Sequence, residues 1–252
     1  KKSLNAGLDI NYLLFIINQS RDQLEKYLRD KVGFEVLPSG CLIKSGGPII
    51  LTAHMDTINT KMFDYQEDYC YPIPIKVENG IISKDTKSKM TDDQMKMCLG
   101  GDDRCGIFLA LVLQKKYPDI FTVIFSDKEE NGHGYNTIEL TQHEIWLNKF
   151  VICLDSTEKN VFSYHAHLEK ELDYLNKKYG FTWEKKSLSN IQYMEGSTGI
   201  NLGMGYAKQH TPEEYIKVEE LRAAYSYVIE LSKKIGWAMS VLFFLCKSLK
   251  LN

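Results

Sequence analysis

The sequence predicts an α/β fold, a three-layer α/β/α sandwich with a mixed, mostly parallel central sheet, built by one domain over residues 1–252. Short apolar runs typical of buried strands alternate with longer segments whose apolar residues recur at helical spacing. No internal repeat, low-complexity tract or linker divides the chain. Hydrophobic residues make up 44% of the sequence, which is enough apolar material for a core.

Charge and cysteine usage narrow the class of protein. The 31 Lys and Arg residues nearly balance the 33 Asp and Glu residues, so nothing favours nucleic acid or an acidic membrane as a partner. The six cysteines form no Cys-x-x-Cys pair, and several lie within apolar stretches. This pattern predicts free, buried thiols and a cytoplasmic protein.

The N-terminal part of the chain predicts helix and then strands. Apolar residues recur at helical spacing over residues 9–31, with an interruption near Asn18, and Gly33 is a stop signal. Short strands follow, and the last of them is apolar on both faces, as expected of a central strand. These runs cover residues 34–37, 41–43 and 48–53.

Residues 59–100 form a polar excursion from this alternation. Two β-like pieces, at 73–77 and 80–83, flank Asn79-Gly80 and predict a hairpin. Residues 84–97 are charged and rich in Met, and we expect them to form a mobile loop.

The second half of the chain returns to alternating helices and strands. A buried helix is predicted over residues 105–117, and the following Pro118 ends it. A long closing helix is predicted over residues 213–235. An apolar run at 237–246, at roughly ten residues, is too short to span a bilayer. We expect it to form a helix packed on the core or on another subunit, which leaves room for a homo-oligomer. Buried strands are predicted at residues 121–125, 150–154 and 200–203.

Acidic and His residues follow these strands at the places where an open α/β sheet binds ligands, beyond the carboxyl ends. Each such residue alone is more often a turn former, a helix cap or a surface charge. Their joint occurrence after four apolar runs and ahead of one helix indicates a metal centre. The residues are His54 and Asp56, Glu129 and Glu130, Asp155, His210, and the pair Asp102-Asp103.

Five ordered segments resemble the motifs of the MH-clan zinc peptidases, which include leucyl-type aminopeptidases, tripeptidase-like enzymes and glutamate carboxypeptidases. The resemblance runs from about residue 49 to 220, and its His-Thr-Pro-x-Glu-Tyr ending is the most diagnostic part. The segments are Thr52-Ala-His-Met-Asp-Thr, Gly100-Gly-Asp-Asp-Arg-Cys-Gly, Asp127-Lys-Glu-Glu-Asn-Gly, Leu154-Asp-Ser and Asn201-Leu-Gly-Met-Gly-Tyr-Ala-Lys-Gln-His-Thr-Pro-Glu-Glu-Tyr.

The resemblance implies a single zinc-peptidase domain with the phosphorylase/hydrolase-like fold of that clan. It implies a metal-dependent exopeptidase, and we expect an aminopeptidase that hydrolyses small peptides. The intervals 55–101 and 155–210 are too short for the β-barrel or the dimerisation domain that other branches insert there. The single-domain leucyl-type aminopeptidase branch therefore fits best.

The resemblance also implies a role for each residue. Asp102 would bridge two zinc ions, and manganese or cobalt could also occupy such sites. Asp56 would orient the ring of His54, and Glu129 would act as general base. One ion would be completed by His54 and Asp155, and the other by Glu130 and His210.

The neighbours of Asp102 are expected to play other parts. Asp103 would cap the following helix or orient nearby groups, and Arg104 would either bind a substrate carboxylate or pair with an acid. Cys105 lacks the cationic surroundings that a nucleophilic thiol needs. The remaining histidines are not expected to bind metal. We expect His165 and His167 at surface or packing positions, and His133 and His143 in loops.

Two other functions remain open. A glutaminyl cyclase on the same fold would use a single zinc held by Asp102, Glu130 and a His, but the intact His54 and Asp56 argue against it. A non-catalytic metal-binding module is disfavoured by Glu129. One departure is Asn190, where relatives often carry Asp, and it bears on substrate binding rather than on metal binding.

Overall fold

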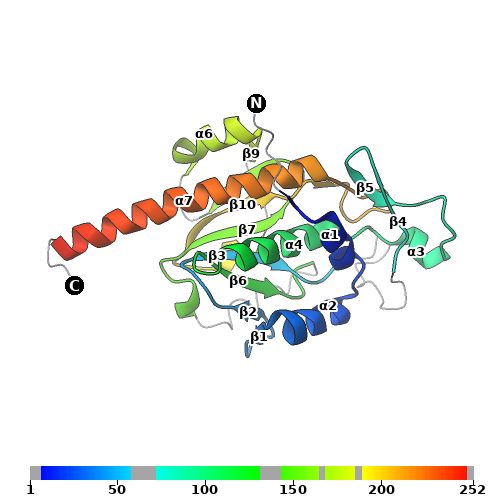
Figure 1. Ribbon diagram of the computed structural model, residues 1–252, viewed down its shortest axis with the longest axis horizontal. Coiled ribbons are helices and arrows are strands. Elements are labelled where there is room, and N and C mark those ends of the chain that lie inside the picture. Colours follow the sequence, from blue (N-terminus) through cyan, green and yellow to red (C-terminus); the bar gives the residue numbers. More distant parts are fainter. Residues whose placement is uncertain (1–6, 58–71, 131–142, 165–167, 185–188, 249–252) are drawn as a thin grey trace.

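A central sheet of eight strands forms the middle of the molecule in the computed structural model, which describes residues 7–57, 72–130, 143–164, 168–184 and 189–248 (Figure 1). In strand order it is β1-β2-β6-β3-β7-β10-β8-β9. The strands are Glu35–Val36 (β1), Leu42–Lys44 (β2), Ile49–His54 (β3), Phe121–Ser126 (β6), Phe150–Ser156 (β7), Asn160–Tyr164 (β8), Thr182–Trp183 (β9) and Thr198–Gly203 (β10).

The middle of this sheet is parallel and its flanks are mixed. Strands β6, β3, β7 and β10 run parallel, whereas β2 pairs antiparallel with β6 and β8 pairs antiparallel with β10. Every residue of β3 and β6 is buried, as the apolar runs predict for strands covered on both faces. The predicted mixed, mostly parallel sheet is therefore confirmed.

Helices lie mainly on one face of the sheet (Figure 1). Alternate strand residues such as Leu51 and Ile152 join the apolar cluster that these helices cover, and Ile50 and Val151 point into a second cluster on the other face. Trp146 and Ile191, next to or within short 3-10 turns, belong to that second cluster. The helices are Ile10–Ile17 (α1), Arg21–Tyr27 (α2), Gly101–Lys116 (α4), Glu169–Tyr179 (α6) and Val218–Ser248 (α7), and the 3-10 turns are His143–Ile145 (η3) and Asn190–Tyr193 (η4).

The N-terminal helical segment ends where its sequence signals predict. Asp9 caps α1, and Ser20 forms a capping box with Gln23 at the start of α2. A π-helical turn, Leu28–Val32 (η1), continues α2 to Gly33, whose φ of 80° is the left-handed conformation that favours glycine at a helix end. The predicted interruption near Asn18 is the break between α1 and α2.

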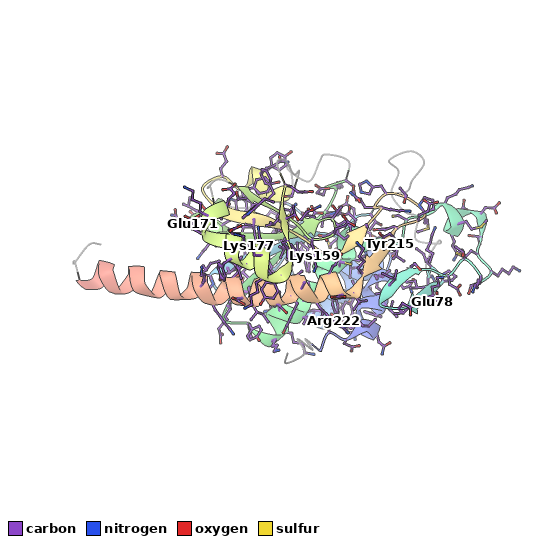
Figure 2. All side chains as sticks on the ribbon, turned by 90° about the horizontal axis from the view of Figure 1, so that it is seen from above. Glu78, Lys159, Glu171, Lys177, Tyr215 and Arg222 are labelled. Carbon is purple, nitrogen blue, oxygen red and sulfur yellow. The ribbon has the colours of Figure 1, made fainter. Side chains whose placement is uncertain are left out.

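A second sheet, antiparallel and four-stranded, stands beside the first in the order β11-β12-β5-β4. The predicted hairpin is confirmed, because β4 and β5 pair around Asn79-Gly80, whose φ angles are 51° and 78°. Figure 2 shows Glu78 and Tyr215 of this sheet on the side away from the C-terminal end of α7. Its strands are Ile75–Glu78 (β4), Ile81–Lys84 (β5), Tyr206–Ala207 (β11) and Tyr215–Lys217 (β12).

Two predicted elements need correction. The closing helix begins at Val218 rather than 213, because Tyr215–Lys217 pair with β5 as strand β12. The loop expected at 84–97 contains a short helix, Asp92–Lys96 (α3), which starts at a capping box formed by Thr91 and Gln94.

The apolar run at 237–246 continues α7 without a break. The last turns of this helix extend beyond the sheet and the other helices in both views (Figures 1 and 2). The backbone of these turns does not lie against the core of its own chain, which was the first of the two expected arrangements. The second, a contact with another subunit, stays a prediction. Among the described residues, no helix has the length and apolar character needed to cross a membrane.

Candidate metal centre

The parallel strands carry the predicted residues to one edge of the sheet. His54 is the last residue of β3, Asp155 lies near the end of β7, and Glu129 and Glu130 follow β6. Because these strands are parallel, their carboxyl ends meet at that edge. His210 arrives from the loop between β11 and β12.

Three of these side chains form a first group of possible ligands. The Nε2 atom of His54 lies 3.0 Å from Oδ1 of Asp102 and 3.5 Å from Oδ1 of Asp155. One donor atom from each residue falls within 4.8 Å of the other two. These are the residues predicted to hold the first ion.

A second group shares Asp102 with the first. The Nε2 atom of His210 lies 3.2 Å from Oδ2 of Asp102 and 2.8 Å from Oε1 of Glu130, and these three residues again place donor atoms within 4.8 Å of one another. Asp102 thus turns one carboxylate oxygen toward each histidine. A bridging carboxylate needs this orientation.

The two groups differ in their access to solvent. The side chain of His54 is 1% exposed and that of His210 is 39% exposed. The ring of His54 therefore lies in the interior, whereas the ring of His210 is in contact with solvent.

Asp56 lies behind His54 as expected, and its carboxylate has a further task besides the predicted contact with the ring. Nδ1 of His54 lies 2.9 Å from the main-chain oxygen of Asp56, and the carboxylate is farther away, at 3.5 Å. The carboxylate also accepts the main-chain N–H groups of Glu129 and Glu130, at 3.2 and 3.1 Å. The ring is thus oriented by the carbonyl of Asp56, and the carboxylate holds the loop that carries the two glutamates.

The two residues after Asp102 are buried and form hydrogen bonds to the backbone around His54. The carboxylate of Asp103 accepts the N–H groups of Gly106 and His54, at 3.1 and 3.2 Å, so it both caps the regular part of α4 and fixes a ligand, as predicted. Arg104 is fully buried and donates to the main-chain oxygens of Met55 and Gln19. Its burial and these two hydrogen bonds give it a structural role, and both expected roles, contact with a substrate carboxylate and pairing with an acid, stay predictions.

Gly106 shows how closely α4 approaches the sheet. A Cβ atom at this position would lie 2.3 Å from the main-chain oxygen of Leu154 on β7.

Burial raises the pKa of the neighbouring Cys105 thiol, which agrees with the expectation that Cys105 is not a nucleophile.

Three further residues form hydrogen bonds to the candidate ligands Asp155 and Asp102, and their motif positions alone predicted no such role. The hydroxyl of Tyr206 donates to Oδ1 of Asp155 at 3.2 Å. The side-chain amide of Asn201 accepts the N–H of Asp155 and donates to its carbonyl. Glu214, which is buried, accepts the N–H groups of Gly100 and Asp102. All three belong to the last motif segment, but their hydrogen bonds to distant residues leave no mark on its spacing.

Crowding of carboxylates in a buried place shifts their titration. Burial raises the pKa of Glu129 to about 8 and that of Asp155 to about 6, and the neighbouring carboxylates add to both shifts. Burial alone would also raise the pKa of Asp102, but hydrogen bonds from His210 and His54 hold it below its usual range. Negative charge concentrated in this way favours a cation at the site.

The donor set fits two divalent ions. It consists of imidazole nitrogens and carboxylate oxygens, which zinc accepts readily. The hydrogen bond from Nδ1 of His54 to the carbonyl of Asp56 places the proton on that nitrogen and leaves Nε2 free to bind a metal. The shared carboxylate supplies one oxygen to each group.

The cysteines whose side chains are described do not belong to either group of possible ligands. His143 begins η3, in agreement with its expected loop position. His133, His165 and His167 and the side chain of Asn190 lie outside the described residues. The cysteines whose side chains are described are buried and form no disulfide, as predicted, and are Cys41, Cys98, Cys105 and Cys153.

No protein-family model matches the chain, and no curated protein matches its sequence. Solved structures match it in fold. Aminopeptidase PepT from Bacillus cereus has a TM-score of 0.65 and 14% identity, and the match covers 90% of this chain and 98% of that one. A tripeptidase from Staphylococcus aureus has a TM-score of 0.55 and 13% identity over 90% and 97% of the two chains. The TET1 peptidase of Pyrococcus horikoshii has a TM-score of 0.58 and 14% identity over 89% and 99%. The chain therefore has the α/β fold of these peptidases.

Proposed function

We propose that the chain is a metal-dependent exopeptidase, an aminopeptidase of short peptides that uses two zinc ions and Glu129 as general base. One observation carries the proposal: Asp102 turns one oxygen toward His54 and the other toward His210, and these residues arrive from separate parts of the chain. Two divalent ions bound at these groups would lower the pKa of a shared water toward about 7 and polarise the scissile carbonyl.

Side chains of the protein transfer the proton and fix the position of the general base. Glu129 takes a proton from the attacking water and delivers it to the leaving amine. In the metal-free chain its carboxylate is mostly buried and burial raises its pKa, and two bound cations would favour the carboxylate form that accepts a proton. The carboxylate of Asp56 fixes the position of the base through the N–H of Glu129.

Asp56 couples this base to the metal ligands. Its carbonyl orients His54 and its carboxylate holds the N–H of Glu130, so one residue contacts the base and a ligand of each group. A displacement of Asp56 would therefore disturb both metal positions and the base together.

The choice of an aminopeptidase of the leucyl-type branch rests on the motifs and on the similar structures, which include an aminopeptidase and a tripeptidase. Manganese or cobalt could replace zinc at such nitrogen and oxygen donors. A cytoplasmic location remains part of the proposal and is supported by the buried thiols that form no disulfide.

A glutaminyl cyclase would need only the group around His210. The first group is nevertheless present as well, with Nε2 of His54 close to the carboxylates of both Asp102 and Asp155. The presence of both groups favours two metals and hydrolysis, and it also disfavours a module that only stores a metal.

Metal analysis combined with hydrolysis assays tests the proposal. The purified chain should bind two divalent ions and hydrolyse members of a panel of amino-acid p-nitroanilides, and a chelator should abolish hydrolysis until zinc is restored. One ion per chain with cyclisation of N-terminal Gln would establish the cyclase instead. Two ions without hydrolysis of the panel or of di- and tripeptides would contradict the peptidase.

A further inference from the structure

Glu214 joins two parts of the metal centre that are far apart in sequence. It lies in the loop between β11 and β12 that also carries His210, and it is 1% exposed. Its Oε2 atom accepts the N–H of Gly100 at 2.7 Å, and its Oε1 atom accepts the N–H of Asp102 at 3.1 Å. One carboxylate thus holds the backbone on both sides of Gly101.

The backbone that Glu214 holds is irregular. Gly100 has a φ of 83°, and Asp102 and Asp103 depart from helical angles, so the first N–H groups of this segment do not enter the regular helix. A carboxylate that accepts two such N–H groups satisfies donors that would otherwise be orphaned. A Cβ atom on Gly101 would lie 3.0 Å from Oε1 of Glu214, so the loop and the carboxylate are in close contact.

The position of Asp102 decides the geometry of both groups of ligands, because each group uses one of its oxygens. His210 belongs only to the second group and sits at a φ of 59° in a half-exposed loop. Glu214 is buried in that same loop, and its own N–H donates to the carbonyl of Thr211. It therefore anchors the loop of His210 to the backbone of Asp102.

We propose that Glu214 is a positioning residue, which sets Asp102 and His210 at the spacing that two metal ions require before either ion binds. The inference rests on the proposed function, since it concerns the same centre. The alternative role, a buried acid that only stabilises the fold, would lower the stability of the metal-free protein without weakening metal binding.

The test compares Glu214→Gln with Glu213→Gln. Glu213 is the adjacent residue and is exposed, so its variant loses the same charge and controls for electrostatics at a distance. Gln keeps the shape of Glu but has one carbonyl oxygen, so one of the two N–H groups loses its acceptor. Zinc affinity is measured on metal-free protein against a chromophoric chelator, and the absorption of the cobalt-loaded protein reports ligand geometry.

We expect Glu214→Gln to bind zinc about 10- to 100-fold more weakly and to show an altered cobalt spectrum. Glu213→Gln should keep the affinity and the spectrum of the wild-type protein. Binding and spectra of Glu214→Gln equal to those of Glu213→Gln overturn the inference and leave the proposed function intact. A wild-type chain that binds no metal overturns both.

A second measurement keeps the inference testable where Glu214→Gln does not fold. In metal-free wild-type protein, the N–H groups of Gly100 and Asp102 should exchange with solvent far more slowly than those of an unfolded peptide, since Glu214 holds them without metal. Rapid exchange of both N–H groups in the otherwise folded protein overturns the inference.

Discussion

Replacement of Asp56 by Asn tests the support of the metal centre without a change in the size of the side chain. The Asp56 carboxylate accepts two main-chain N–H groups, from Glu129 and Glu130, and the residue is fully buried. An Asn side chain has one carbonyl oxygen and presents an NH₂ group in place of the second acceptor. One of the two N–H groups therefore loses its partner.

The expected cost follows from that lost partner. A buried donor without an acceptor costs about 1–3 kcal/mol, so Asp56→Asn should lower the free energy of unfolding of the metal-free protein by about that amount. Asp56→Ala loses both acceptors and should lower it by roughly twice as much. Because the same loop carries the proposed general base and a proposed metal ligand, kcat/KM should also fall, roughly 10- to 100-fold.

Urea unfolding in the presence of a chelator measures the first effect, and hydrolysis of an amino-acid p-nitroanilide by the zinc-loaded protein measures the second. Asp119→Asn is the control, because Asp119 is exposed and the variant loses the same charge. An Asp56→Asn protein as stable and as active as the control would refute the role assigned to this carboxylate.

Three further changes test other parts of the account. Glu129→Gln should lower kcat by about 10²- to 10⁴-fold while zinc content and unfolding midpoint stay at wild-type values, and a variant that stays active would exclude Glu129 as the base. His210→Ala should reduce the zinc content to one ion per chain, whereas Asp102→Asn should weaken both sites, because only Asp102 faces both groups; equal losses in elemental analysis would count against a shared ligand. Gly199→Ala should cost about 1–3 kcal/mol in urea unfolding, since its Cβ atom would lie 1.9 Å from a main-chain oxygen of β7, and Gly7→Ala, where no atom lies within 4 Å, should be neutral.

The sequence predicts which side chains lie together because parallel strands impose a common edge, and their binding of metal stays a prediction. His54 and Asp155 each come at the end of an apolar run that the structure shows as a buried central strand. The carboxyl ends of such strands meet whatever their exact register, so the prediction does not depend on knowing that His54 pairs with Ser126. The role of Asp102 as the shared ligand came from the resemblance, and the facing oxygens agree with it.

The sequence predicts strands less well where they are short and pair with a strand far away along the chain. Strand β12 is three residues long, too short for a period of two to be distinguished, and its partner β5 lies far away along the chain. The pattern at 213–217 therefore looked like the start of a helix. Helix α3 was missed although its capping-box residues, Thr91 and Gln94, are visible in the sequence.

Hydrogen bonds to backbone N–H groups are the main part of the site that the sequence does not reveal. Asp56 was expected to accept from the ring of His54, because a carboxylate is the stronger acceptor, but its carbonyl is nearer to the ring. The N–H groups of Glu129 and Glu130 compete for that carboxylate, and no residue type in the sequence marks them. Glu214 belongs to the His-Thr-Pro-x-Glu-Tyr motif but was given no role for the same reason, since both of its partners are backbone groups.

Anomalous X-ray diffraction at the zinc edge tests the shared centre most directly. Crystals of the zinc-loaded protein should show two peaks about 3.5–4 Å apart, one on each side of the Asp102 carboxylate. One peak should lie near His54 and Asp155 and the other near Glu130 and His210. A single peak, or two peaks that do not share Asp102, would contradict the account.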